Sequence, residues 1–376
     1  MKILHIGLAS HYTENMLYQD NILTEMNAKA GHDVVYIGDA YCFKDGKLVK
    51  EEECDRILKN GIRLIKVKYD YIICDFITRK IQKVKKLVAY LNEIKPDAIL
   101  YHGLCGYELI DVSEYAKNND VLFYVDSHMN FTNTARTPIA KFAYKYVNGY
   151  FVKKALKVAK KVFYIGYAEK DYLREMYHIP EKDMEFFPLG GIIVSEIKQK
   201  EYREVLLKEM EFPKDVIICS HSGKMDRFKK TDEVVSAFSS VKNDRLRLLI
   251  YGDLMDDIRY KVCELIKNDD RVSFLGWKNA KEQEKILSAT DLYIQPGSFS
   301  ATAQVALCCG CALIVKDEYK RALKDSVFYG NNSVEVEVIL RSIVDDEKVL
   351  IKMKEKGYKF AKEELDYELL ANRYLK

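Results

Sequence analysis

The sequence predicts an α/β protein made of two doubly wound domains, each with a parallel sheet covered by helices. Three observations lead to this fold class. Short apolar runs alternate with longer helical patterns along the chain, as in parallel strands joined by right-handed crossovers. The pattern breaks once, around residues 190–212, and then resumes. The length of 376 residues suffices for two or three domains.

Six strands are expected before the break, each a short run of apolar residues. They are Ile3–Leu8, Asp33–Gly38, Ile62–Val67, Ala98–Tyr101, Val121–Val125 and Lys161–Ile165. Five more are expected after the break. They are Val216–Ser220, Arg247–Tyr251, Val272–Leu275, Leu292–Ile294 and Ala312–Val315. Helices fill most of the gaps, and residues 333–376 are expected to contain helix and no strand.

The domain boundaries are expected where the strand pattern stops and restarts. They give a Rossmann-like N-terminal domain over 1–190, a linker over 191–212, a second Rossmann-like domain over 213–355, and a C-terminal helix over 356–376 that packs back towards the first domain. The linker is placed where Pro188-Leu189-Gly190-Gly191 leads into a polar, lysine-rich stretch. We expect the two sheets to face each other across a cleft.

Composition excludes several classes of protein. Lys and Arg number 60 and Asp and Glu 57, a net charge of +3, which is too balanced for a nucleic-acid-binding protein. The nine cysteines are an odd number without CxxC spacing, which indicates free thiols in a reducing compartment. The longest later apolar run, Ala306–Val315, is about half of a bilayer span. We therefore expect a cytoplasmic protein without a nucleic-acid partner.

Parallel sheets bind ligands beyond the carboxyl ends of their strands, and one such end in the second half suits an anion. Gly223, Lys224 and Lys229 follow the strand Val216–Ser220. Glycine lets the backbone approach a ligand closely, and the lysines can direct positive charge at a diphosphate. A solvated loop is the alternative.

A second anion site is expected at the start of the helix Ala301–Cys309. Ser300 is expected to cap this helix, leaving the amides of Ala301 and Thr302 free. The positive end of the helix then contributes about 0.3–1 kcal/mol per anionic charge. An ordinary serine cap that binds nothing is the alternative.

In the first half, polar residues follow three of the expected strands. Asp126 and His128 come two residues apart after Val121–Val125, so both can face the cleft. An imidazole there could bind a substrate hydroxyl or transfer a proton. Ser10 and His102 lie at two other strand ends. A histidine that is merely hydrogen-bonded within the structure remains the alternative.

Short motifs occur in a characteristic order over almost the whole chain. They are the opening strand, Gly31-His32-Asp33-Val34, Lys95-Pro96-Asp97, Pro188-Leu189-Gly190, Gly223-Lys224 with Lys229, Gly276-Trp277 and Cys309-Gly310. In this order the chain resembles glycosyltransferases of the GT-B fold, specifically the glycosyltransferase family 4 group. The resemblance implies transfer of a sugar from a nucleotide-sugar donor, UDP- or GDP-linked, with retention of configuration and without a metal or other cofactor.

The resemblance also implies roles for individual residues. The C-terminal domain would bind the donor, with Gly223, Lys224 and Lys229 at its diphosphate and Gly276 and Trp277 at its nucleobase. The N-terminal domain would bind a glycan or lipid-linked saccharide as acceptor, as in bacterial surface polysaccharide synthesis. Its expected acceptor-binding residues are Ser10, His102, Asp126 and His128, and the expected catalytic residues are His128, Lys224 and Lys229.

One departure from the family concerns two glutamates that members commonly have seven residues apart before the Cys-Gly pair. Neither glutamate is present in this sequence. The position of the second one corresponds to Val305, or to Gln304 if the alignment is shifted by one residue. Their hydrogen bonds would have to come from other polar side chains of the segment. These are Ser298, Ser300, Thr302 and Gln304.

The sequence leaves two alternatives to glycosyl transfer open and disfavours a third. A catalytically inactive homologue that binds glycan or partners with an active transferase is an alternative, because both glutamates are missing. A sugar-nucleotide epimerase of the same fold is another. A dinucleotide-dependent oxidoreductase is disfavoured, because the turn after the first strand lacks GxGxxG.

The charge distribution predicts a further partner. Between Ser127 and Ala168 there is no acidic residue, yet eight basic ones occur within residues 136–161, interleaved with aromatic residues. Each surface Lys or Arg contributes about 1 kcal/mol at an anionic leaflet. The segment therefore predicts peripheral association with the inner face of a membrane, with solvated helix faces as the alternative.

Overall fold

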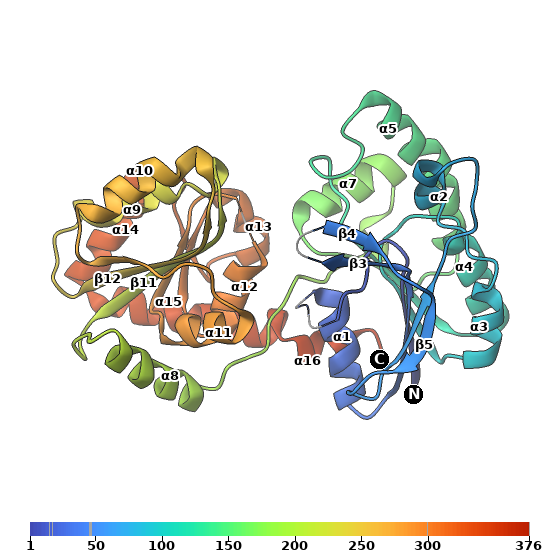
Figure 1. The fold of residues 1–376 in the computed structure, drawn as a ribbon, viewed down its shortest axis with the longest axis horizontal. Helices are drawn as coiled ribbons and strands as arrows, with labels where there is room; N and C mark the ends of the chain where they lie inside the picture. Colours follow the sequence, from blue (N-terminus) through green and yellow to red (C-terminus); the bar gives the residue numbers. More distant parts are fainter. Residues whose placement is uncertain (15, 17, 45–46, 299, 376) are drawn as a thin grey trace. The chain divides into compact units, whose positions relative to one another are not determined.

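The computed structural model describes residues 1–14, 16, 18–44, 47–298 and 300–375 of the protein. The chain forms two compact units (Figure 1). Unit 1 consists of Met1–Pro188 and Tyr367–Lys376, and unit 2 of Leu189–Asp366. Each unit contains a sheet of mainly parallel strands between helices, as the sequence predicts.

The sheet of unit 1 has eight strands in the order β10-β9-β8-β7-β1-β2-β6-β5. Neighbouring strands are parallel, except that β5 runs antiparallel to β6. The strands are β1 (Lys2–Gly7), β2 (Asp33–Asp39), β5 (Cys54–Ile57), β6 (Arg63–Val67), β7 (Ala98–Tyr101), β8 (Leu122–Ser127), β9 (Lys161–Tyr164) and β10 (Met184–Phe186). A separate antiparallel pair consists of β3 (Tyr41–Lys44) and β4 (Lys47–Lys50).

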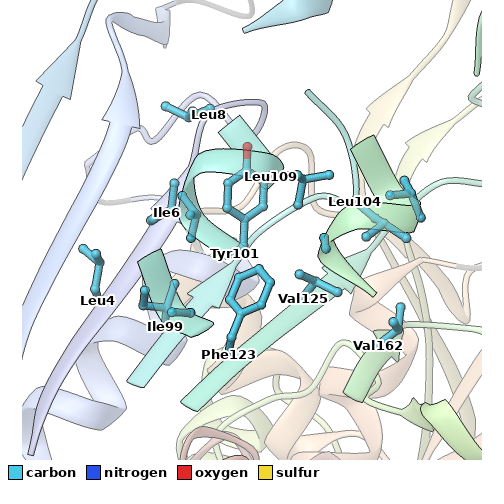
Figure 2. Packing of buried hydrophobic residues seen from close by; sticks show 14 of the residues in the cluster. Leu4, Ile6, Leu8, Ile99, Tyr101, Leu104, Leu109, Phe123, Val125 and Val162 are labelled. Carbon is cyan, nitrogen blue, oxygen red and sulfur yellow. The ribbon is translucent and has the colours of Figure 1, made fainter. Parts of the chain in front are cut away.

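The central strands of this sheet are apolar on both faces because helices cover both. Ile99 and Phe123 lie in one buried cluster together with Leu4 (Figure 2). Their neighbours in sequence, Leu100 and Tyr124, lie in a second cluster. Burial on both faces removes the polar–apolar alternation of a half-exposed strand. This is why short apolar runs located these strands.

One helical layer of unit 1 combines segments from the two ends of the sequence. α1 (Gln19–Lys29) packs against α16 (Tyr367–Arg373), with Leu23 and Leu370 in the same buried cluster. The Asn27 side-chain amide of α1 donates to the Ala371 carbonyl at 2.7 Å. The other helices of unit 1 are α2 (Asp75–Ile81), α3 (Leu87–Ile94), α4 (Glu108–Asn118), α5 (Pro138–Phe142), η1 (Ala143–Asn148), α6 (Gly149–Ala155) and α7 (Tyr167–Tyr177).

The sheet of unit 2 has six parallel strands in the order β13-β12-β11-β14-β15-β16. They are β11 (Ile217–Met225), β12 (Leu246–Leu254), β13 (Val272–Phe274), β14 (Leu292–Gln295), β15 (Ala312–Val315) and β16 (Phe328–Tyr329). The principal helices are α8 (Glu196–Glu209), α9 (Thr231–Ser240), α10 (Asp256–Lys267), α11 (Ala280–Ala289), α12 (Ala301–Cys308), α13 (Lys320–Leu323), α14 (Ser333–Asp345) and α15 (Glu347–Phe360).

Each predicted strand is present, with small shifts at most of its ends. β11 and β12 extend furthest beyond the predictions, because their backbones continue to pair past the apolar residues as far as Met225 and Leu254. The sequence analysis missed β3, β4, β5, β10 and β16. These strands are short, and β5, β10 and β16 lie at sheet edges, where side chains need not be apolar.

The structure differs from the predicted linker and C-terminal helix. Residues 191–212 contain α8, which is held in unit 2 by ion pairs from Lys198 to Glu284 at 2.6 Å and from Arg203 to Asp291 at 2.8 Å. This helix is largely polar, so its composition resembled that of a linker. The helix predicted over 356–376 is divided, because α15 ends within unit 2 and α16 returns to unit 1. Lys376 lies outside the described residues.

Candidate functional site

Two segments of unit 2 that the sequence analysis selected meet at the carboxyl end of its sheet. One is residues 223–230, here called the lysine loop, and the other leads into α12. The Ser298 amide donates to the Phe228 carbonyl at 2.8 Å, and the Lys229 ammonium donates to the Ser298 carbonyl at 2.8 Å. Gly297 is required at this crossing, because a Cβ there would lie 2.2 Å from the Phe228 oxygen. The two predicted anion sites are therefore neighbours.

Lys229 is a buried cation that forms no ion pair with a carboxylate in the described part of the chain. It ends a short turn that Asp226 caps by accepting from the amides of Phe228 and Lys229. Burial disfavours the charged ammonium and lowers the pKa of Lys229 to about 8, while Asp226 opposes this shift. A bound anion would offset the cost of burying this charge.

Gly223 and Lys224 lie at the end of β11, paired with Gly252 and Asp253 of β12. Both glycines have positive φ angles, +126° and +118°, and a Cβ on Gly252 would lie 2.2 Å from the Gly223 oxygen. Side chains are thus excluded where the two strands approach each other. Lys224 is exposed, and within the described residues its side chain has no hydrogen bond or ion pair.

Gly276 and Trp277, the predicted nucleobase segment, follow β13 and are linked to this glycine pair by a backbone hydrogen bond. The Gly276 carbonyl accepts a hydrogen bond from the Gly252 amide at 2.9 Å. The next side chain, Trp277, is 66% exposed. A large aromatic face therefore remains open to solvent, where it could stack on a planar ring.

The start of α12 differs from the prediction in the role of Ser300. Ser300 occupies the cap position, but its side chain does not cap the helix. Its hydroxyl instead donates to Gln295 Oε1 at 3.2 Å, so the predicted capping bond is wrong. The first turn contains no acidic side chain. The amides of Ala301 and Thr302 lie at the positive end of the helix and thus remain available to an external anion.

Gln304 lies one turn further along α12. Its side chain is only 7% exposed, and its Oε1 has no hydrogen-bond partner among the described residues. Leaving a buried acceptor unpaired costs about 1–3 kcal/mol, so a ligand hydroxyl that reached this oxygen would be favoured. The Ser298 side chain is exposed, whereas Phe299 of the same loop lies outside the described residues.

The sequence analysis missed two side chains that organise this edge. Gln295, at the end of β14, donates from Nε2 to the Ser298 carbonyl at 2.5 Å. His221 within β11 bonds to the Ile294 carbonyl at 2.7 Å and to Thr231 Oγ1 at 2.9 Å. Burial lowers the pKa of His221 to about 4, so this imidazole is neutral. The only sign of these roles in the sequence was that Gln295 and His221 are polar residues within or next to apolar strands.

Unit 1 contains a buried imidazole chain, formed by His5, His102 and Asp126 at the sheet centre. His5 Nδ1 lies 3.0 Å from His102 Nε2, and His102 Nδ1 lies 2.5 Å from Asp126 Oδ2. Burial lowers the pKa of His5 to about 3. Burial also opposes charge on His102, but the Asp126 carboxylate outweighs it and raises the His102 pKa. The pKa of Asp126 is lowered, since His102 outweighs its burial.

The buried imidazole chain corrects part of the predicted acceptor site. Both ring nitrogens of His102 are already bonded, and Asp126 also accepts from the Gly103 amide at 2.9 Å. Both side chains are buried, so neither is exposed to contact an acceptor as predicted. His128 is exposed, with Nε2 3.8 Å from Asp126 Oδ1. Ser10 is half-buried and lies 2.8 Å from the Tyr36 hydroxyl.

Among the described residues, no group of three or more His, Cys, Asp or Glu side chains is placed to hold a metal ion. No helix in the same part of the chain has both the length and the apolar character needed to cross a bilayer.

Comparisons with known proteins agree with this architecture. Residues 203–360, all in unit 2, match the family model of glycosyl transferases group 1. A search of curated protein sequences found no match. A glycosyltransferase from Rickettsia africae is similar in structure, with a TM-score of 0.70 and 16% identity over 100% of this chain and 96% of that one. Anabaena HepE in complex with UDP has a TM-score of 0.66 and 14% identity, over 100% and 98%.

The same fold also occurs with a different reaction. UDP-GlcNAc 2-epimerase from Neisseria meningitidis bound to UDP-GlcNAc has a TM-score of 0.59 and 12% identity, over 100% and 98% of the two chains. The chain therefore has the GT-B fold, which is the fold that the resemblance inferred from the sequence implies. The fold alone does not determine the reaction, so the function rests on the residues of the site.

Proposed function

We propose that the protein is a glycosyltransferase that moves a sugar from a nucleotide-sugar donor, bound by unit 2, to an acceptor bound by unit 1. The observation that carries this proposal is Lys229, a buried cation at the crossing of the lysine loop and the segment before α12. The match of this unit to glycosyl transferases group 1 supports it.

The chemistry requires positive charge at this place. Breaking the bond between the sugar and the diphosphate leaves negative charge on the departing phosphate oxygen. Lys229, Lys224 and the amides at the start of α12 would stabilise that charge, and one such donor typically contributes about 3 kcal/mol, or roughly a hundredfold in rate. With fixed ammonium groups in this role, we propose a reaction that needs no metal ion. Retention of configuration is what the resemblance to GT-B glycosyltransferases implies.

The remainder of the donor would extend from the diphosphate along the same edge. Trp277 offers an aromatic face to the base of a UDP- or GDP-linked sugar, and the structure of Anabaena HepE contains UDP. Gln304 would accept from a donor hydroxyl through its unpaired Oε1. This contact would replace one of the two glutamates that the family commonly has.

In unit 1, His128 would contact the transferred sugar. Its imidazole is exposed beside Asp126, and the buried imidazole chain holds that carboxylate in place. The acceptor would be a glycan or a lipid-linked saccharide, as in the synthesis of bacterial surface polysaccharides.

A lipid-linked acceptor is supported by an exposed stripe of apolar side chains in the basic segment 136–161. The stripe runs along α5, η1 and α6 and consists of Ile139, Phe142, Tyr146 and Tyr150, each more than half exposed. Three or four residues separate successive members, so they share one side of the helix. Basic residues are interleaved with them along the sequence from 136 to 161. Helices that lie in a membrane interface typically insert apolar side chains into the bilayer and carry basic side chains beside them.

A thermal-shift series with UDP, GDP, ADP and CDP tests donor binding first. At a hundredfold excess over Kd, one nucleotide should stabilise the folded protein by about 2.7 kcal/mol. If none stabilises it, the proposal is wrong. Nucleotide release from the matching sugar nucleotide, measured with and without a glycan acceptor, then separates the candidates. An inactive homologue would bind without turnover, and an epimerase would convert the donor without an acceptor.

A further inference from the structure

Unit 1 contains a pocket outside the sites described above. Ala40 and Tyr41 line it directly after β2, and Lys68 and Tyr69 line it directly after β6. β2 and β6 are neighbouring parallel strands, so the pocket lies at the carboxyl edge of the sheet, where parallel sheets bind ligands. It is separated from Asp126 on β8 by β7 and β1.

The charged residues that line this pocket are mainly cationic. Lys50, Lys68 and Arg79 contribute positive charge, and Asp75 is the one carboxylate among its lining residues. Lys50 and Arg79 are exposed, and neither side chain has a hydrogen bond or ion pair with another described residue. Lys68 is paired with the exposed Glu52, and such surface pairs contribute little. Lys50 and Arg79 are therefore available to an anion, and an anion that binds Lys68 has only a weak surface pair with Glu52 to displace.

Tyrosine rings form the other walls of the pocket. The rings of Tyr41 and Tyr69 are 6.2 Å apart between centroids and 30° from parallel. The Tyr69 hydroxyl is held by the buried carboxylate of Asp39 at 2.9 Å. Tyr71 lies at the rim and is largely exposed. An aromatic face packs against the apolar face of a sugar ring, while the hydroxyl end remains polar.

We propose that this pocket binds the phosphate group of a phosphorylated saccharide acceptor. Arg79 would bind two phosphate oxygens through its planar guanidinium, Lys50 and Lys68 would neutralise the remaining charge, and the tyrosines would hold the adjoining sugar ring. The proposal rests on the proposed function, since it names the class of acceptor that the transferase would use.

The phosphate could belong to a soluble sugar phosphate or to a lipid-linked saccharide, and the structure favours the second. Lys80, next to Arg79 in α2, lies 3.5 Å from the hydroxyl of Tyr144. Tyr144 belongs to η1, the helix that carries part of the exposed stripe. The pocket is thus connected through α2 to the face proposed to meet the membrane.

Binding of glucose 1-phosphate, inorganic phosphate and glucose to the full chain tests the pocket, with titration calorimetry as the measurement. The double variant Lys50→Gln, Arg79→Gln loses two charge-assisted contacts to the phosphate, so it should bind glucose 1-phosphate roughly a hundredfold more weakly than wild type. The matched control Lys29→Gln, Lys117→Gln removes two exposed lysines from α1 and α4 and should bind as wild type does.

A second arm identifies the source of the phosphate. Phosphatidylcholine vesicles with and without polyprenyl phosphate are sedimented with the wild type and with both double variants. Weaker binding of the Lys50→Gln, Arg79→Gln protein to polyprenyl phosphate vesicles supports a lipid-linked acceptor. A defect limited to glucose 1-phosphate supports a soluble one.

Equal binding of all three proteins to glucose 1-phosphate and to polyprenyl phosphate vesicles would overturn the proposal, as would equal affinity of the wild type for glucose and glucose 1-phosphate. The stabilisation of each protein by nucleoside diphosphate is measured in parallel. Because that response depends on unit 2, its retention would show that the pocket assignment had failed and the proposed function had not.

Discussion

The Lys229 ammonium donates to the Ser298 carbonyl oxygen at 2.8 Å. This one bond links the lysine loop to the segment before α12, and it holds a buried cation beside the open start of that helix. A carbonyl satisfies only part of an ammonium group, which has three donors. The remaining donors and the full charge are left for a ligand anion.

Replacement of Lys229 by methionine should abolish most turnover without unfolding the protein. Methionine keeps much of the side-chain volume and removes the charge, so sugar-nucleotide turnover should fall by roughly a hundredfold. Stability should be unchanged or higher, because a charge that is costly to bury has been removed. The control Lys242→Met changes an exposed lysine and should behave as wild type. Full activity of Lys229→Met would contradict the assignment.

Binding of a nucleoside diphosphate should take up a proton above neutral pH. Burial lowers the pKa of Lys229 to about 8, so the free protein loses this proton as the pH rises through that value. A diphosphate favours the charged form, and its affinity should fall over the same pH range. Calorimetry near pH 8, in buffers with different ionisation enthalpies, measures the uptake. Lys229→Met should show none.

The free protein should also become more stable as the pH rises from about 8 to about 10.4, the unperturbed value for lysine. In this window the unfolded chain binds the proton and the folded chain does not, so stability increases with pH. Urea unfolding of the wild type and of Lys229→Met should show this difference. Parallel curves would mean that Lys229 has an ordinary pKa.

The His102–Asp126 pair should stabilise unit 1 within a limited pH window. The raised pKa of His102 contributes to the free energy of unfolding. This contribution is complete below the pKa of histidine in the unfolded chain, about 6.5, and is lost as the pH rises through the His102 pKa in the folded protein. The lowered Asp126 pKa gives one that is lost as the pH falls through its folded value. The difference in unfolding free energy between wild type and His102→Gln should therefore peak at mildly acid pH. A difference independent of pH would show that the pair is uncharged.

Tyr374→Phe should destabilise the protein by about 1–2 kcal/mol. The Tyr374 hydroxyl is buried and donates to Asn27 Oδ1 at 2.6 Å, which also accepts from His5 Nε2 at 2.9 Å. Its removal leaves Asn27 with one partner fewer and takes away one of the bonds that hold the end of the chain to α1. Urea unfolding measures the loss. The control is Tyr260→Phe, which alters an exposed tyrosine in α10 and should be neutral.

The exposed stripe predicts membrane binding through both charge and insertion. Changing Ile139, Phe142 and Tyr146 to serine should release the protein from vesicles that contain anionic lipid, because each large apolar side chain contributes about 1.5–3 kcal/mol when it leaves water. A comparable control is Val334→Ser, Val338→Ser, which changes exposed apolar residues of α14 in unit 2. Sedimentation that did not depend on anionic lipid or on the stripe would remove the membrane proposal. Stabilisation by nucleotide should be the same in all these proteins.

The sequence by itself determined the two sheets, most of their strands and the two segments that meet around Lys229. These features follow from local rules, since burial on both faces produces apolar runs, and parallel strands place their loops at one edge. Only the tertiary structure decided that Ser300 bonds to Gln295 instead of capping α12. The same holds for His102, which is sealed between His5 and Asp126. Each of these contacts joins residues that come together only through the order of the strands and the crossing of the loops. Residue type and local spacing in the sequence do not predict that order or that crossing.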